Sequence, residues 1–329
     1  MNGDTESVMQ SPERVRLLVV APVNSAMETV RRILFAPFDL SRWLILGFTA
    51  WLATMAGDVS WSGINFNFNP GRAMSAADLP ARALPWLREN AFLLMAIILP
   101  LAVLGLVVSL LVLWVGSRGK FMFLENIVRN RAEVAAPWRR NRGAGNSYFL
   151  FSLVFALASL LLLALLLGGL ALLALPDWSR DTVGAGTVTA LLLGAFTIPL
   201  YLLVLACVLA LMEDFVVPLM LLRSCRVMAA WRILADLLRQ RPGAFALYLL
   251  FRTLLQLVLG LLALLLMCAT CCLAAVPYVG AVLLLPLHVF MRTYSLHYLE
   301  QFGPAYCLME DAPDDVAAVP APSEGQDGN

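Results

Sequence analysis

The sequence has little charge, and almost none of its positive charge is lysine. Charged residues make up 14% of the 329 residues, whereas soluble domains carry about 25%. A single lysine, Lys120, stands among 22 arginines. The low charge comes with long apolar runs, which excludes an ordinary soluble domain and indicates a membrane protein. The formal net charge of +1 offers no excess for a polyanion, so we expect no nucleic acid partner.

Histidine and catalytic motifs are also scarce. The only two histidines, His288 and His297, both fall in the last apolar run, so a histidine-based zinc site is not expected. The chain contains no G-x-S-x-G, H-E-x-x-H or Walker motif. Cys268, Cys271 and Cys272 form a C-x-x-C at the end of an apolar run, where we interpret them as small residues that suit helix packing. We therefore predict no catalytic residue, no metal and no cofactor.

The apolar runs predict an all-α polytopic membrane helix bundle with about six transmembrane helices. They form one domain, 23–303, between a lead at 1–22 and an acidic tail at 304–329, both of which we expect to be disordered. The first run is short, so a re-entrant segment is the alternative there. The predicted spans are residues 43–59, 91–115, 148–175, 188–212, 254–276 and 278–299.

Three basic, half-apolar segments each precede a pair of these runs. Met27, Phe121 and Phe215 open the three segments at equal intervals along the chain. In the first segment, Met27, Val30 and Leu34 share one face at helical spacing. We expect three interfacial amphipathic helices that lie in the headgroup layer with the apolar face toward the membrane.

The distribution of basic residues predicts the orientation of the chain in the membrane. The N-terminal segment and every second loop after it hold five, seven and five arginines or lysines, and the alternate loops hold three, one and none. Cytoplasmic loops carry such an excess, so both termini are expected in the cytoplasm. The bias toward leucine, alanine and arginine suggests a GC-rich bacterial genome, and hence the bacterial cytoplasmic (inner) membrane.

Polar residues within the fifth and sixth runs form the candidate site. Arg252 and Gln256 are one helical turn apart, and His288 and Arg292 share a face of the next run. Ionisable residues in spans are costly and usually face the bundle interior, which favours a cytoplasm-side pocket for an anion such as a lipid headgroup. In the alternative, the side chains of both arginines only extend to the membrane interface. Glu213 and Asp214 are the first candidate counter-charges for the arginines, and Glu300 is the second. The candidate ligand-binding residues are Arg252, Gln256, His288, Arg292, Glu213 and Asp214.

Four segments resemble those of uncharacterised bacterial multi-span membrane families. They are Phe35–Trp43, Phe121–Asn126, Glu213–Pro218 and Tyr298–Gly303. These families are similar in layout to the membrane domain attached to some glycerophosphodiester phosphodiesterases. The resemblance implies topology and no chemistry, because the chain has no soluble phosphodiesterase domain.

These observations favour a non-enzymatic membrane scaffold that binds lipids or a protein partner in the membrane. A small transporter is one alternative, which the prolines Pro199, Pro218 and Pro286 in or beside the apolar runs support, because transporters use broken helices. A membrane enzyme or accessory subunit acting on lipid phosphate is another, with only Glu213 and Asp214 as candidate acids.

Overall fold

The structure, a computed structural model, describes residues 18–55, 90–178, 184–270 and 276–309, and its regular structure in those ranges is entirely helical. This confirms the all-α prediction. The helices are α1 (Ala21–Leu34), α2 (Leu40–Met55), α4 (Ala91–Val128), α5 (Ala135–Arg140), α6 (Arg142–Trp178), α7 (Ala185–Leu211), the π-helical turn η2 (Met212–Val216), α8 (Val217–Arg223), α9 (Val227–Gln240), α10 (Pro242–Ala269), α11 (Pro277–Leu283), α12 (Leu285–Glu300) and the 3-10 turn η4 (Pro304–Tyr306).

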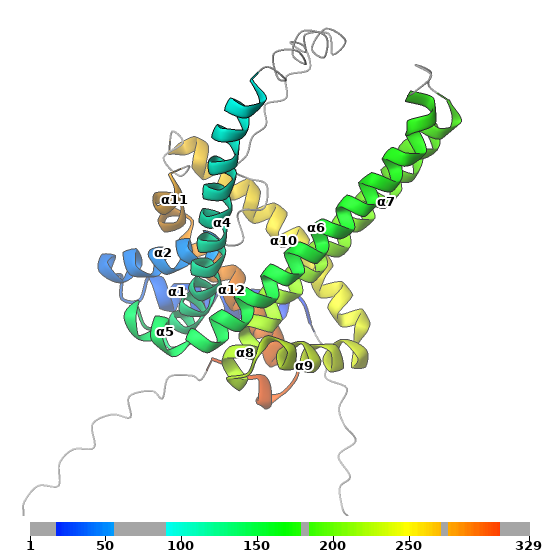
Figure 1. Cartoon of the computed structure of the whole chain (residues 1–329). Coiled ribbons are helices and arrows are strands. Elements are labelled where there is room, and N and C mark those ends of the chain that lie inside the picture. Colours follow the sequence, from blue (N-terminus) through cyan, green and yellow to red (C-terminus); the bar gives the residue numbers. More distant parts are fainter. Residues whose placement is uncertain (1–17, 56–89, 179–183, 271–275, 310–329) are drawn as a thin grey trace, which may run out of the picture.

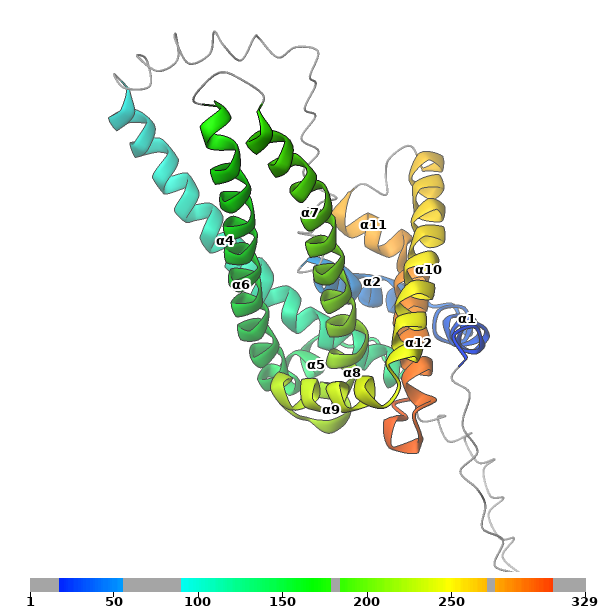
Figure 2. The ribbon, with the colours of Figure 1, turned by 90° about the vertical axis from the view of Figure 1, so that its right-hand side faces the viewer.

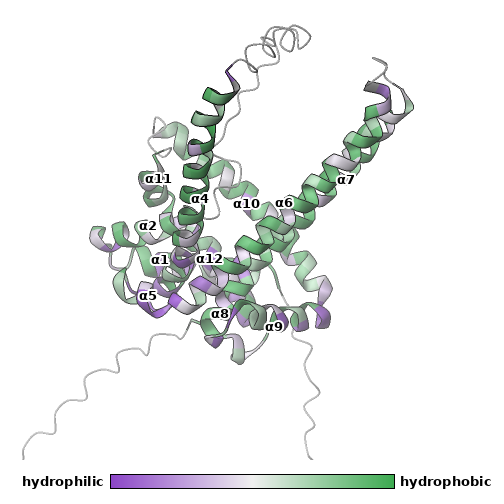
Figure 3. Cartoon of the chain, in the orientation of Figure 1, coloured by the Kyte–Doolittle hydropathy of each residue, from purple (hydrophilic) through white to green (hydrophobic). Residues whose placement is uncertain are grey.

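Four long helical stretches in the described parts of the chain are long and apolar enough to cross a membrane. They rise from a common base, and α6 and α7 pair as an antiparallel hairpin (Figures 1 and 2). α4 and this hairpin diverge away from the base, and their far halves are apolar and exposed (Figure 3). Such surfaces are suited to contact with lipid. The four stretches are Met95–Val128, Arg142–Asp177, Ala185–Arg223 and Pro242–Ala269.

The first and last predicted spans correspond to shorter helices. α2 has 16 residues and lies across the base, and residues 56–59 of the predicted span 43–59 fall outside the described ranges. The predicted span 278–299 is divided between α11 and α12, with the break at Leu284. Pro286 stands in the first turn of α12, where a backbone N–H would have no helical partner and its absence costs no hydrogen bond. The same proline prevents α11 from continuing into α12 as one helix.

The amphipathic segments pack differently from the prediction. α1 rests on α12, and it buries Ala26, Val30 and Ile33 while Met27 is 58% exposed. The protein itself therefore covers the apolar face that we expected to meet the membrane. The segment that begins at Phe121 is the end of α4 and not a separate interfacial helix, and it is buried in the core. α9 lies along the outside of the base, as an interfacial helix would (Figure 2).

The core lies in the base and is rich in aromatic rings. Tyr248 of α10 stacks on Tyr294 of α12 with ring centroids 5.6 Å apart, and its ring is 4.4 Å from that of Tyr298. Phe215 of η2 and Phe245 of α10 complete this cluster at 5.2 Å from each other. Such ring contacts add to the free energy gained from burial. The base is thus a packed aromatic core from which the four long helices extend.

The ends of the described chain extend slightly beyond the predicted domain. α1 begins at Ala21, and Leu18 exchanges hydrogen bonds of 2.9 and 3.0 Å with the side chain of Gln301. The N–H of Met309 donates to Glu300 Oε1 at 3.4 Å, so residues 304–309 of the predicted tail fold back on α12. Most of the predicted lead, 1–17, and of the tail, 310–329, lies outside the described residues.

Candidate functional site

The candidate site is organised around the π-helical turn η2, where α7 passes into α8. A π turn inserts an extra residue into a helix and often marks a functional site. Here it carries two consecutive acids, Glu213 and Asp214. Neighbouring helical residues point about 100° apart, so the two carboxylates meet different partners.

Asp214 pairs with the arginine of α10. The Nε of Arg252 donates to Asp214 Oδ2, and the hydroxyl of Tyr248 donates to the same oxygen at 3.0 Å. A second guanidinium nitrogen of Arg252 donates to Gln256 Oε1 at 2.8 Å. Asp214 is 4% exposed and Arg252 is 9% exposed, so the arginine does not extend to solvent. In the structure Arg252 is therefore paired with Asp214 rather than extended to the surface.

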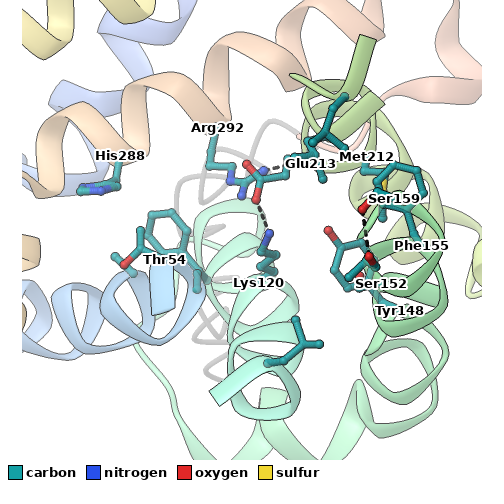
Figure 4. A pocket seen from close by; sticks show the side chains of 17 residues that line it. Thr54, Lys120, Tyr148, Ser152, Phe155, Ser159, Met212, Glu213, His288 and Arg292 are labelled. Atoms are coloured by element: carbon teal, nitrogen blue, oxygen red, sulfur yellow. Dashed lines mark hydrogen bonds and ion pairs between the residues drawn. The ribbon is translucent and has the colours of Figure 1, made fainter. Parts of the chain in front are cut away.

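The side chain of Glu213 points toward Lys120 of α4 and Arg292 of α12 (Figure 4). Its carboxylate accepts a hydrogen bond from the ammonium group of Lys120, which is buried. Arg292 of α12 donates from Nη1 to the main-chain oxygen of Glu213 at 2.7 Å. Two cations from different helices thus converge on one acidic residue.

These three residues line a cavity of about 360 Å³ among α2, α4, α6, α7, η2 and α12. His288 also reaches it, with Nδ1 2.9 Å from the oxygen of Leu284. Its polar lining further includes Thr54, Tyr148, Ser152 and Ser159, and its apolar lining includes Leu113, Phe123, Phe155, Leu205 and Leu209. The cavity therefore combines charged and polar side chains with apolar ones, which is the character of a site for an amphipathic molecule.

The structure divides the six predicted residues into two groups. Glu213, Arg292 and His288 line the cavity, whereas Asp214, Arg252 and Gln256 form a hydrogen-bonded group on the other side of η2. The two groups adjoin at the consecutive acids Glu213 and Asp214. Glu300, the second candidate counter-charge, pairs with His297 at 2.8 Å and not with Arg292.

Lys120 is the site residue that sequence reasoning missed. It is 93 positions from Glu213, and it falls in the basic connection that we expected to lie on the cytoplasmic side of the membrane. One signal was present, because it is the only lysine in a chain whose other cations are all arginine.

The comparisons with known proteins identify a family but no activity. No curated protein matches the chain, and no solved structure matches it. Nothing found supports the likeness in layout to glycerophosphodiester phosphodiesterases. Residues 17–287 match the family described as "Family of unknown function (DUF7544)", which is most of the chain. The chain therefore belongs to this family of unknown function.

Proposed function

We propose that the protein is a non-enzymatic integral membrane scaffold that binds an anionic lipid in the cavity beside η2. The observation that carries the proposal is the lining of that cavity. Lys120 and Arg292 supply two positive charges against the single carboxylate of Glu213, so the site has an excess of one positive charge. An anionic headgroup balances that excess, and a charge without such balance is costly in a membrane.

The apolar lining is suited to the rest of such a lipid. Phe155 of α6 and Leu205 and Leu209 of α7 lie on the side of the cavity formed by the helical hairpin. The hairpin and α4 diverge from the base (Figure 1), and the apolar side chains exposed along them offer a surface for acyl chains. Burying each CH₂ of such a chain is worth about 0.8 kcal/mol.

The setting that we propose is the bacterial cytoplasmic membrane, with both termini in the cytoplasm. The asymmetry of basic residues along the chain supports this orientation. In this orientation the base lies on the cytoplasmic side, and membrane lipids are the primary partners. A protein partner in the membrane is the alternative, and the exposed apolar faces of the long helices offer surface for one.

A small transporter is a second candidate function, which the broken helices favour. α7 passes through the π turn η2, and the last apolar segment is interrupted between α11 and α12. Transporters use discontinuous helices of this kind at their substrate sites. The enzymatic alternative has less support, because the side chains of Glu213 and Asp214 are both held in ion pairs.

Native mass spectrometry of the detergent-solubilised chain tests lipid binding. We expect phosphatidylglycerol to form adducts at lower concentration than zwitterionic phosphatidylcholine. Arg292→Gln should weaken phosphatidylglycerol binding about tenfold, because a hydrogen bond to a charged group is worth about 1.5–3 kcal/mol and 1.4 kcal/mol is tenfold. Glutamine removes the charge and keeps an amide donor, and the melting temperature of the variant checks that the fold is retained.

The matched control is Arg32→Gln, which removes the same charge from the exposed last turn of α1. It should bind phosphatidylglycerol as the wild type does. Equal affinity of the wild type for the two lipids would refute the proposal, and so would an Arg292→Gln variant that binds like the control.

A further inference from the structure

A second charged cleft lies at the base, where α4 and α5 end, α6 begins and α8 turns into α9. It has a volume of about 400 Å³ and shares no lining residue with the cavity beside η2. Three arginines line it, Arg129, Arg140 and Arg226, against one acid, Glu125. The charged lining residues therefore carry an excess of two positive charges.

The acid in this cleft is buried and holds two of the arginines in place. Glu125 is 2% exposed, and its carboxylate accepts hydrogen bonds from Arg140 Nη1 and from the amide of Asn141. Arg129 Nε forms an ion pair with the same carboxylate at 3.1 Å. The side chains of Arg129 and Arg140 are nevertheless 52% and 50% exposed. Each guanidinium is thus anchored at one edge while half of its side-chain surface stays open.

The third arginine arrives through the turn between α8 and α9. Ser224 ends α8 in the left-handed conformation, with φ of 47°, and the main chain then turns sharply into α9. Arg226 is the last residue before α9, and its side chain is exposed. The N–H of Val227 donates to Ser147 Oγ at 3.3 Å, which ties this turn to the start of α6. The turn therefore brings Arg226 to the cleft that Arg129 and Arg140 line.

We propose that this cleft is a phosphate-binding site. Guanidinium groups bind phosphate oxygens through paired hydrogen bonds, and a guanidinium that is already oriented loses less conformational entropy when it binds. Glu125 supplies this orientation, and it leaves an unbalanced charge that a phosphate group compensates. The phosphate belongs either to a lipid headgroup at the surface of the membrane or to a free phosphate compound.

The test uses the full chain in detergent, with Arg140→Gln and Arg226→Gln as variants. In Arg140→Gln the carboxylate of Glu125 keeps its ion pair with Arg129 and its hydrogen bond from Asn141, so it is not left without a partner. Isothermal titration calorimetry is run with two probes, inorganic phosphate and the short-chain lipid dioctanoyl phosphatidylglycerol. We expect each variant to bind the effective probe about tenfold more weakly than the wild type, as the loss of one charge-assisted hydrogen bond implies.

The control variant is Arg239→Gln, at the other end of α9. Arg239 is 83% exposed and lies 4.0 Å from Asp236, outside the cleft. It should bind both probes as the wild type does. If the probes bound only through a general attraction between a basic surface and an anion, all three substitutions would weaken probe binding equally, and the proposal would be overturned. Unchanged affinity in Arg140→Gln and Arg226→Gln would also overturn it.

The two probes separate the sources of the phosphate. If inorganic phosphate binds and both cleft variants weaken its binding, the ligand is a free phosphate compound. If only the lipid binds and both cleft variants weaken its binding, the ligand is a lipid headgroup. Arg292→Gln, in the other cavity, should leave the calorimetric affinity for the cleft unchanged. Failure of this inference is therefore distinguishable from failure of the proposed lipid cavity.

Discussion

Replacing Arg252 by leucine should leave the buried carboxylate of Asp214 without its ion pair. Asp214 is 4% exposed and relies on Arg252 for its ion pair. Removing one partner of a buried pair costs about 3–5 kcal/mol, because the remaining charge is left without compensation. The hydroxyl of Tyr248 still donates to Asp214 at 3.0 Å, and a hydrogen bond to a charged group is worth about 1.5–3 kcal/mol. We therefore expect a loss at the low end, about 3 kcal/mol.

Denaturant titration of the detergent-solubilised protein measures this loss as a change in the free energy of unfolding. Asp214→Asn in the same chain removes the stranded charge, so the double variant should recover part of the stability. The coupling energy from the double-mutant cycle should fall at about 1–3 kcal/mol. Arg252→Lys keeps the charge but gives up the paired contact with Asp214 and Gln256, and should cost about 1 kcal/mol for the lost hydrogen bond.

Two results would refute this reasoning. If Arg252 only extended to the interface, Arg252→Lys would be silent and Arg252→Leu nearly so. Strict additivity of Arg252→Leu and Asp214→Asn would show that the two side chains do not stabilise each other, and the contact in the structure would then carry no stability.

Two further predictions address packing and topology. A Cβ added at Gly119 of α4 would lie 2.6 Å from the main-chain carbon of Leu52 in α2, so Gly119→Ala should cost about 1–3 kcal/mol of unfolding free energy. The control Gly105→Ala meets nothing within 4 Å and should be neutral or stabilising by about 0.5–1 kcal/mol, and equal effects at the two positions would contradict the close approach of α2 to α4. A reporter fused after Ala318 should read cytoplasmic and one inserted near Ser75 should read periplasmic, both at positions outside the described residues. A cytoplasmic reading at Ser75 would show that the first apolar run does not cross the membrane.

Part of the candidate site was predictable from the sequence. Arg252 lies in an apolar helix, 38 residues after Asp214, and the cost of a lone charge there implied a nearby carboxylate. Which of the two acids pairs with Arg252 was not predictable, because it depends on how η2 orients their side chains. The contact of Lys120 with Glu213 was not predictable either, because it joins residues of two helices far apart in the sequence.

The sequence by itself determined the all-α class and predicted a membrane protein, because long apolar runs with little charge have no other stable arrangement in lipid. It also located the four long apolar stretches, since hydropathy is a local property. Tertiary structure decided where the charged residues go. α4 continues as a helix through Arg118 and Lys120 because the guanidinium of Arg118 lies against Trp114 and bonds to Asn146, and Lys120 has Glu213. The tertiary structure also decided that α1 packs on α12. A helix with one apolar face buries that face against lipid or against protein, and only the folded chain places an apolar partner beside it.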